Sequence, residues 1–335
     1  MRYKSLCITA LLGGFLISGL SSTAYADCPR GSLDTQFCDV DNDLVADLPT
    51  DESKWKDPST LVFTYTPVED PAVYRDVFTD FQDYLAEATG KKVIYYTVQS
   101  NSAEVEAMRS GRLHIAGFST GPTGFAVNLA GAVPIAVKGG PDGFQGYNLI
   151  LITRKDSGIK SLSDLKGKKV AHTSPSSNSG NLAPRALLPD EGIVPEEDYT
   201  VAFSGKHDQS ILGVVSGDYD AAPVASDVFD RMVARGVVNA DDIEIIYRSP
   251  KFPTSSFAYA HNLKPELVHK IVGAFHTYRF PPKMQEAFKG ADRFYPITYK
   301  ADWDVIRTIA SATGASYDRK GLQAMAAKEA AKKKK

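Results

Sequence analysis

From Thr60 onward the sequence alternates between β-rich segments and segments with helical periodicity. Leu61–Tyr65 is a β-rich run, and residues 74–88 repeat apolar side chains at the spacing of one helix face. Further β-rich runs follow over residues 93–98 and 113–118. This alternation limits the possible folds most strongly, because consecutive β and α segments pack as sheets covered by helices. We therefore predict an α/β protein.

The length of the chain predicts two such units. It has 335 residues, and a domain typically takes about 150. Two extended segments, 147–153 and 250–259, are candidates for hinge strands that carry the chain from one unit to the other. We expect residues 60–149 together with 255–320 to form lobe 1, and residues 150–254 to form lobe 2. Each lobe is predicted to be a mainly parallel sheet flanked by helices.

Residues 1–26 have the pattern of a secretory signal peptide. Arg2 and Lys4 precede a mostly apolar run of fourteen residues, Cys7–Leu20, and an A-x-A cleavage site ends at Ala26. The apolar run is too short to span a bilayer comfortably. We therefore expect a soluble protein that is exported to the periplasm.

Residues 27–59 read as a polar N-terminal arm. Its two cysteines, Cys28 and Cys38, are an even pair in an oxidising compartment and are expected to form a disulfide. Asp39–Asp47 reads D-x-D-x-D-x-x-x-D, but Leu44 stands where a calcium loop carries glycine. We expect a solvated acidic arm here, with a calcium loop as the alternative, and we assign no metal or cofactor to the chain.

The charge balance argues against a nucleic-acid partner. The chain carries 38 Lys and Arg against 40 Asp and Glu, a net charge of −2, whereas a duplex-DNA binder needs a strong basic excess. The lysines at 332–335 end a segment, 321–335, that we expect to be a solvated basic tail.

The segment 172–188 is the strongest candidate for binding chemistry. It follows a strand-like run and opens a helix, and Ser176, Ser177, Asn178 and Ser179 gather at the helix start. Hydroxyl groups and free backbone N–H groups there form a neutral anion site, assisted by the helix dipole. Plain N-capping is the alternative, but a cap needs only one serine.

Other polar residues are expected to converge on the same cleft. Tyr65 lies at the end of one predicted strand, and Thr120 and Thr123 follow another. Ligands of open α/β sheets bind beyond the carboxyl ends of the strands. His207 precedes a predicted helix and is placed to donate to an anion, although a capping pair with Asp208 is an equal alternative.

A competing motif points to a different class of protein. Gly117–Gly121 reads G-x-S-x-G after a strand, as in the nucleophile elbow of α/β-hydrolases, with Ser119 as the nucleophile. An elbow serine leads straight into a helix, whereas Pro122 intervenes here. His207 and Asp208 are adjacent in sequence, which is a poor arrangement for a base and its orienting acid. A secreted serine hydrolase is therefore the rival hypothesis.

Three segments of the sequence match a known family: Ser161–Ala171, Pro175–Pro184, and His207–Asp208 followed by Gly217–Ala222. By these segments the chain resembles the periplasmic phosphonate-, phosphite- and phosphate-binding proteins of ABC transporters. The resemblance extends over roughly residues 60–315. The resemblance implies the two-lobed type II solute-binding fold with a hinged cleft.

The resemblance also implies roles for particular residues. Ser177, Asn178 and Ser179 would hold the anion, His207 would donate from the same lobe, and Tyr65 would line the cleft from the other lobe. The protein would bind its ligand without changing it and deliver it to an inner-membrane permease. An oxyanion-sensing protein that feeds a sensor kinase is the alternative.

The sequence departs from the family pattern in three places. Phe125 replaces a tyrosine of the Gly-Pro-x-x-Tyr loop, and Asn178 replaces a Ser or Thr of the anion motif. The stretch 253–256 holds no carboxylate, whereas aminoalkylphosphonate binders carry an acidic residue there to pair with the ligand amine. These departures favour a small oxyanion such as phosphate, phosphite or methylphosphonate over a ligand with a cationic tail.

Overall fold

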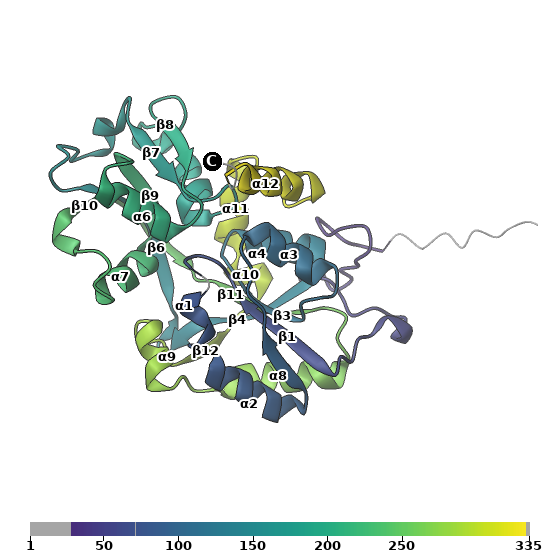
Figure 1. Cartoon of the computed structure of the whole chain (residues 1–335). Helices are drawn as coiled ribbons and strands as arrows, with labels where there is room; N and C mark the ends of the chain where they lie inside the picture. Colours follow the sequence, from purple (N-terminus) through teal and green to yellow (C-terminus); the bar gives the residue numbers. More distant parts are fainter. Residues whose placement is uncertain (1–27, 71, 333–335) are drawn as a thin grey trace, which may run out of the picture.

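The computed structural model describes residues 28–70 and 72–332 and shows two sheets covered by helices (Figure 1). The strands of the larger sheet are β1 (Thr60–Tyr65), β2 (Lys92–Tyr95), β3 (Ile115–Phe118), β4 (Ala132–Gly140), β5 (Gly143–Phe144), β11 (Ser256–Ala260) and β12 (Arg293–Pro296). The strands of the smaller sheet are β6 (Gly146–Arg154), β7 (Lys169–His172), β8 (Thr200–Phe203), β9 (Ala221–Ala225) and β10 (Ile243–Pro253). The signal-peptide prediction for residues 1–26 lies outside the described residues.

Helices cover both sheets. Those that belong with the larger sheet are α1 (Ala72–Arg75), α2 (Thr79–Thr89), α3 (Asn101–Arg109), α4 (Pro122–Ala130), α8 (Pro265–Thr277) and α9 (Pro282–Ala287). Those of the smaller sheet are α5 (Ala183–Leu187), α6 (His207–Ser216) and α7 (Ser226–Ala234). The chain ends with α10 (Tyr299–Asp302), α11 (Asp304–Ala312) and α12 (Arg319–Lys332). In residues 28–70 and 72–332, no helix has both the length and the apolar character of a bilayer span.

The two-lobed α/β fold is confirmed, but the prediction of mainly parallel sheets is wrong. The strand orders are β12-β4-β11-β3-β1-β2, with β5 beside β4, and β10-β6-β9-β7-β8. β1 pairs in parallel with β2 and β3, and β7 pairs in parallel with β8 and β9. β6 and β11 are the first full strands after each crossing between the lobes, and each runs antiparallel to both of its neighbours. The crossings therefore make both sheets mixed.

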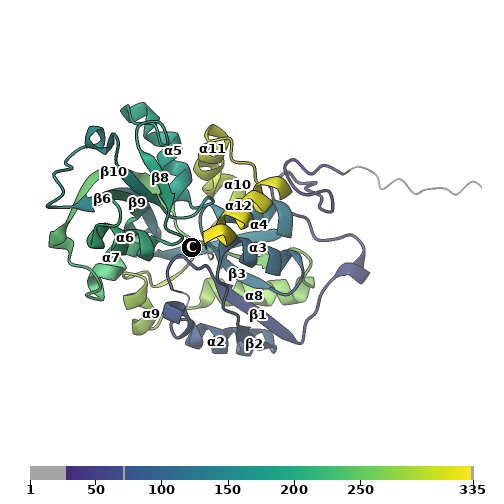
Figure 2. The ribbon, with the colours of Figure 1, turned by 45° about the horizontal axis from the view of Figure 1, so that its top comes forward.

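The chain passes between the sheets at two short places. One lies between β5 and β6, at Gln145, and the other is the pair Thr254 and Ser255 between β10 and β11. The two segments predicted as hinge strands become β6 and the end of β10 with β11. Figure 2 shows β6, β9 and β10 of the smaller sheet on one side of the molecule and β1, β2 and β3 of the larger sheet on the other.

Aromatic side chains form the core of lobe 1 and hold the strand that carries Tyr65. Phe257 lies 4.7 Å from Phe294 and 5.6 Å from Tyr65, measured between ring centres. Phe81 packs edge-on against Phe275 at 4.8 Å. Each such pair contributes about 0.5–1.5 kcal/mol beyond its buried area, so the end of β1 is rigidly placed.

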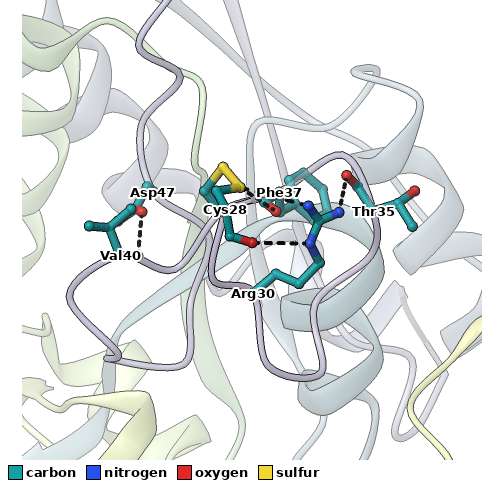
Figure 3. Close-up of a disulfide and its surroundings, with 7 residues drawn as sticks. Cys28, Arg30, Thr35, Phe37, Val40 and Asp47 are labelled. Carbon is teal, nitrogen blue, oxygen red and sulfur yellow. Dashed lines mark hydrogen bonds between the residues drawn. A yellow bond between two sulfur atoms is a disulfide. The ribbon is translucent and has the colours of Figure 1, made fainter. Parts of the chain in front are cut away.

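The N-terminal arm is pinned by the predicted disulfide, which joins Cys28 and Cys38 (Figure 3). Arg30 Nη1 donates to Thr35 O at 2.6 Å within the same loop. The acidic segment is less solvated than we expected, because Asp39 is buried and its carboxylate accepts from Asp43 N at 2.9 Å. The carboxylates of the arm thus accept hydrogen bonds from its own backbone N–H groups.

The C-terminal segment also differs from the solvated tail that we expected. Residues 319–332 form α12, in which Leu322 and Met325 are buried in the core of lobe 1. Their spacing of three residues is a narrow apolar stripe that the run of lysines obscures in the sequence. Lys328 Nζ lies 5.7 Å from the centre of the Phe203 ring on lobe 2, so α12 reaches both lobes. Figures 1 and 2 show α12 lying beside α3 and α4.

Candidate functional site

A cavity of ≈ 40 Å³ lies between the two lobes, at the carboxyl ends of β1, β3 and β7. The polar residues that line it are Tyr65, Asn101, Ser119 and Thr120 from lobe 1, Tyr147, Thr173, Ser174, Ser177, Asn178, Lys206, His207 and Asp227 from lobe 2, and Thr254 and Ser255 from the second crossing. The strand ends of both sheets thus face the same small space, as expected for a ligand site of an open α/β sheet.

The two lobes touch at the edge of this cavity. A β-carbon added to Gly121 of lobe 1 would lie 2.0 Å from the carbonyl oxygen of Ser176 on lobe 2. The Asn101 amide, also from lobe 1, donates to Ser174 Oγ at 3.4 Å. The structure therefore represents a closed form of the cleft, and glycine at 121 is what permits this approach.

The serine-rich segment leads into a π-helical turn at Asn178–Leu182. Ser177 Oγ accepts from Gly180 N at 3.1 Å and so caps this turn. A β-carbon on Gly180 would lie 1.9 Å from Thr173 Oγ1, so glycine lets the turn pack directly against the end of β7. The Thr173 hydroxyl is fully buried beside the cavity with no hydrogen-bond partner among the described residues.

A buried histidine, His172, holds this turn in place through hydrogen bonds. His172 Nδ1 lies 2.9 Å from Asn181 Oδ1, and its Nε2 lies 3.0 Å from the Tyr199 hydroxyl. Burial lowers the pKa of His172 to about 4. The imidazole is therefore neutral at physiological pH and holds the turn through hydrogen bonds rather than charge.

His207 is fixed as a neutral hydrogen-bond donor. Its Nδ1 accepts from Ala225 N at 3.1 Å, so the ring proton of the neutral form is on Nε2. Nε2 points at Ser177 Oγ, 3.4 Å away. Burial lowers the pKa of His207 to about 4, so this N–H group is present as a neutral donor across the physiological range.

Asp227 brings a carboxylate to the cavity from the first turn of α7. Its Oδ2 accepts from Arg231 Nη1 at 2.8 Å. Burial alone would raise the pKa of Asp227, but the nearby charges of Arg231 and Lys138 outweigh burial and bring the pKa to about 2. Asp227 is therefore ionised and acts only as a hydrogen-bond acceptor.

A buried ion-pair cluster joins the lobes next to Asp227. Glu69, which follows β1 on lobe 1, accepts from Arg231 Nε at 2.9 Å and from the Tyr74 hydroxyl at 2.7 Å. It also pairs with Arg235, the residue that follows α7. Burial opposes ionisation of Glu69, but Arg231 and these hydrogen bonds outweigh it and lower its pKa. Glu69 of lobe 1 thus forms ion pairs with two arginines of lobe 2, Arg231 and Arg235.

The hydroxyls of lobe 1 are largely engaged with one another. Ser119 Oγ contacts Thr66 Oγ1 and donates to Asn101 Oδ1 at 3.2 Å. Thr120 Oγ1 donates to Pro253 O at 3.0 Å, and Trp303 Nε1 donates to Thr120 O at 2.9 Å. This wall is a network whose proton directions are set mainly by contacts inside the protein.

Five of the eight predicted ligand-binding residues line the cavity: Tyr65, Thr120, Ser177, Asn178 and His207. The other three, Thr123, Ser176 and Ser179, are buried beside it without lining it. Thr123 Oγ1 is used inside lobe 1, where it contacts Ser256 Oγ at 2.9 Å.

Sequence reasoning missed several lining residues, among them Asn101, Thr173, Ser174 and Asp227. Thr173 and Ser174 come directly after β7, and Asp227 comes two residues after β9. The rule that ligands bind at strand ends would have identified all three. Residues 253–256 hold no carboxylate, as the sequence analysis noted, but Asp227 of α7 brings one to the cavity.

The surroundings of Ser119 do not resemble an activated nucleophile. Its partners are a threonine hydroxyl and an asparagine amide oxygen, and neither is a general base. His207 instead contacts Ser177. α4 begins only at Pro122, so the strand–elbow–helix geometry of a hydrolase is not present at this serine.

A small cavity between two mixed α/β lobes, lined mainly by neutral polar groups, defines a solute-binding protein of the two-lobed periplasmic type. The chain belongs to the family of periplasmic substrate-binding proteins of phosphonate ABC transporters, which it matches over residues 63–303. It is thus the substrate-binding component of an ABC transporter, and the matches favour this role over the sensor and hydrolase alternatives.

Individual relatives agree with this placement. The chain is 29% identical over 282 residues to the phosphate-import protein PhnD of Mycolicibacterium smegmatis, covering 77% of this chain and 87% of the relative. A binding component of an ABC phosphonate transporter from Pseudomonas aeruginosa shares its fold, with a TM-score of 0.69, 20% identity and coverage of 83% of this chain and 98% of that one. PhnD1 of Prochlorococcus marinus, solved with methylphosphonate, has a TM-score of 0.68 at 19% identity, over 77% of this chain and 99% of that one.

Proposed function

We propose that the cavity binds a small phosphorus oxyanion that carries a proton, such as phosphite, methylphosphonate or phosphate. The cavity of ≈ 40 Å³ has room for about three water molecules, since one water needs roughly 10–15 Å³ by this measure. A single tetrahedral group matches that size in the closed form, whereas a long organic substituent does not. The names of the relatives, which include phosphate, phosphonate and methylphosphonate, support this class of ligand.

The observation that carries the proposal is the chemistry of the lobe 2 wall. His207 Nε2–H and the hydroxyls of Thr173 and Ser177 are neutral donors suited to anionic oxygens. Ionised Asp227 is an acceptor in the same cavity. An oxyanion that presents an O–H group to Asp227 is therefore favoured over one, such as sulfate, that has no proton at neutral pH.

Closure of the cleft is the change that we propose a membrane permease recognises when the ligand is delivered. We place the hinge at Gln145 and at Thr254–Ser255, with residues 60–144 and 256–320 as one lobe and 146–253 as the other, so that the first boundary lies a few residues before the one expected from the sequence. A rigid-body closure that brings Gly121 onto Ser176 would let a permease distinguish the loaded protein from the empty one. On this proposal residues 1–26 direct export to the periplasm, and the ligand is released unchanged.

Calorimetry with phosphate, phosphite, methylphosphonate, aminoethylphosphonate and sulfate tests the proposal. We expect tight binding of at least one of the first three and much weaker binding of sulfate. Sulfate binding as tight as that of the phosphorus oxyanions would contradict the role of Asp227. Preference for aminoethylphosphonate would mean that Asp227 pairs with an amine, and no binding of any of the five would refute the function.

A further inference from the structure

Lys138 of β4 is a buried cation directly behind the cavity. It is 1% exposed, and its Nζ donates to the Tyr65 hydroxyl at 3.1 Å. The same Nζ lies 4.4 Å from the centre of the Phe288 ring. In residues 28–70 and 72–332, Lys138 forms no ion pair with a carboxylate. Lysines are almost never fully buried unless they are paired with an opposite charge, so this one calls for an explanation.

The nearest carboxylates are already committed to other cations. Asp227 pairs with Arg231, and Glu69 pairs with both Arg231 and Arg235. The charge of Lys138 helps to lower the pKa of Asp227, but no carboxylate among the described residues forms an ion pair with the Lys138 ammonium. An anion bound in the cavity would therefore add a negative charge on the Tyr65 side of Lys138.

Tyr65 connects this charge to the cavity. Its hydroxyl accepts a hydrogen bond from Lys138, and Tyr65 itself lines the cavity. A phenol has one proton to donate and accepts through its oxygen. Because Lys138 donates to that oxygen, the phenol's own proton is free to point away from the lysine, toward a bound oxyanion.

We propose that Lys138 is a positioning residue for anion binding: it orients the Tyr65 hydroxyl as a donor, and the bound oxyanion adds negative charge near a buried lysine that forms no ion pair with a carboxylate of the described residues. The inference rests on the proposed function, because it requires the ligand to be an anion. On this proposal, part of the site's preference for negatively charged ligands comes from Lys138, a residue that does not line the cavity.

This role predicts opposite effects on binding and on stability. Lys138 is desolvated without a carboxylate in direct contact, so replacing it by an apolar side chain of similar length should not lower stability. The same replacement removes the attraction for the ligand and frees Tyr65 to rotate its proton. A lysine that is merely structural would lose stability and affinity together.

The test compares Lys138→Met with wild type, using phosphite, phosphate and methylphosphonate in calorimetry and thermal unfolding without ligand. We expect Kd to rise at least about tenfold for each anion that the wild type binds, while the unliganded Tm is unchanged or higher. In a Tyr65→Phe background the same substitution should change Kd less, because part of its effect passes through the hydroxyl. Lys169→Met is the matched control, since Lys169 Nζ also lies over a tyrosine ring, that of Tyr219 at 4.8 Å, but outside the cavity.

Each remaining outcome decides against the inference. An unchanged Kd in Lys138→Met, with wild type binding normally, would refute the role of Lys138 and leave the proposed function intact. A fall in Tm that accompanies the loss of affinity would assign Lys138 to the structure alone. An equal change of Kd with and without the Tyr65 hydroxyl would refute the orientation of Tyr65. Absence of any anion binding by wild type would refute the proposed function itself.

Discussion

The two walls of the cavity are built in different ways. The lobe 2 wall comes mainly from one continuous segment, Thr173–Asn178, together with His207, and its donors are held by contacts outside the cavity. The lobe 1 wall combines Tyr65, Asn101 and Ser119 from three separate elements, and its hydroxyls bond mainly to one another. The first wall leaves the hydroxyl protons of Thr173 and Ser177 available to a ligand, whereas the second presents a network that is already largely satisfied.

This difference indicates a division of labour between the lobes. A donor without an internal acceptor, such as the Thr173 hydroxyl, gives the largest gain when it binds an anion, because no internal hydrogen bond is lost. A network of mutual hydrogen bonds instead fixes the shape of the closing lobe. We therefore expect lobe 2 to provide most of the hydrogen-bonding affinity, while lobe 1 closes the cavity and adds the charge of Lys138 through Tyr65.

The largest effect is expected where the two walls meet. In Gly121→Ala the new methyl group would lie 2.0 Å from the carbonyl oxygen of Ser176, and a backbone atom cannot move aside cheaply. The cleft should then fail to close fully, and affinity for the oxyanion should fall about a hundredfold or more. Calorimetry measures the loss, and small-angle scattering should show a more open molecule in the presence of ligand.

Gly273→Ala is the matched control, because a β-carbon there meets no atom within 4 Å. It should bind and close as wild type does. Full closure and normal affinity in Gly121→Ala would mean that the contact between the two lobes at Ser176 is not needed for binding.

The next effect separates two serines of the same motif. Ser177 lines the cavity and caps Gly180 N, whereas Ser179 is buried beside the cavity without lining it. Ser177→Ala removes a ligand donor and a cap, and should weaken binding about ten- to hundredfold. Ser179→Ala should weaken it much less. Equal losses in the two variants, measured by calorimetry, would show that the anion reaches further into the turn than the cavity indicates.

The sequence predicted the lobe 2 wall better than the lobe 1 wall for a physical reason. A helix start with several small polar residues is a local pattern, so Ser177 and Asn178 were identified from adjacent positions. Asn101, Asp227 and Lys138 reach the cavity only through strand order and the pairing of lobes, which no local pattern encodes. The same limit explains the sheets, since the antiparallel strands β6 and β11 result from the chain's crossings rather than from any local period.

A smaller effect concerns the pH stability of the lobe 2 wall. His172 has a pKa of about 4 in the folded protein against the ordinary 6.5, so the unfolded chain takes up a proton that the folded protein excludes. Its contribution to stability is complete above pH 6.5 and is lost as the pH falls from 6.5 toward 4. At pH 5.5 this loss is roughly 1 kcal/mol.

His172→Gln tests this, because glutamine can keep one donor and one acceptor without titrating. Denaturant unfolding of the unliganded protein at pH 7 and pH 5.5 should show a smaller acid loss in His172→Gln than in wild type. His269→Gln, on an exposed face of α8, is the control and should behave as wild type does. An identical acid loss in wild type and His172→Gln would contradict the lowered pKa.

The smallest effect is expected on the lobe 1 wall, at Ser119. This hydroxyl lines the cavity, but it contacts Thr66 Oγ1 and donates to Asn101 Oδ1, so its proton is already engaged. Ser119→Ala leaves Thr66 and Asn101 able to bond to each other at 3.3 Å, and affinity should fall by no more than about threefold. Ester hydrolysis should be absent in wild type and variant alike. A loss as large as that of Ser177→Ala would mean that both walls bind the anion directly, and hydrolysis that depends on Ser119 would show that this wall carries an activated nucleophile after all.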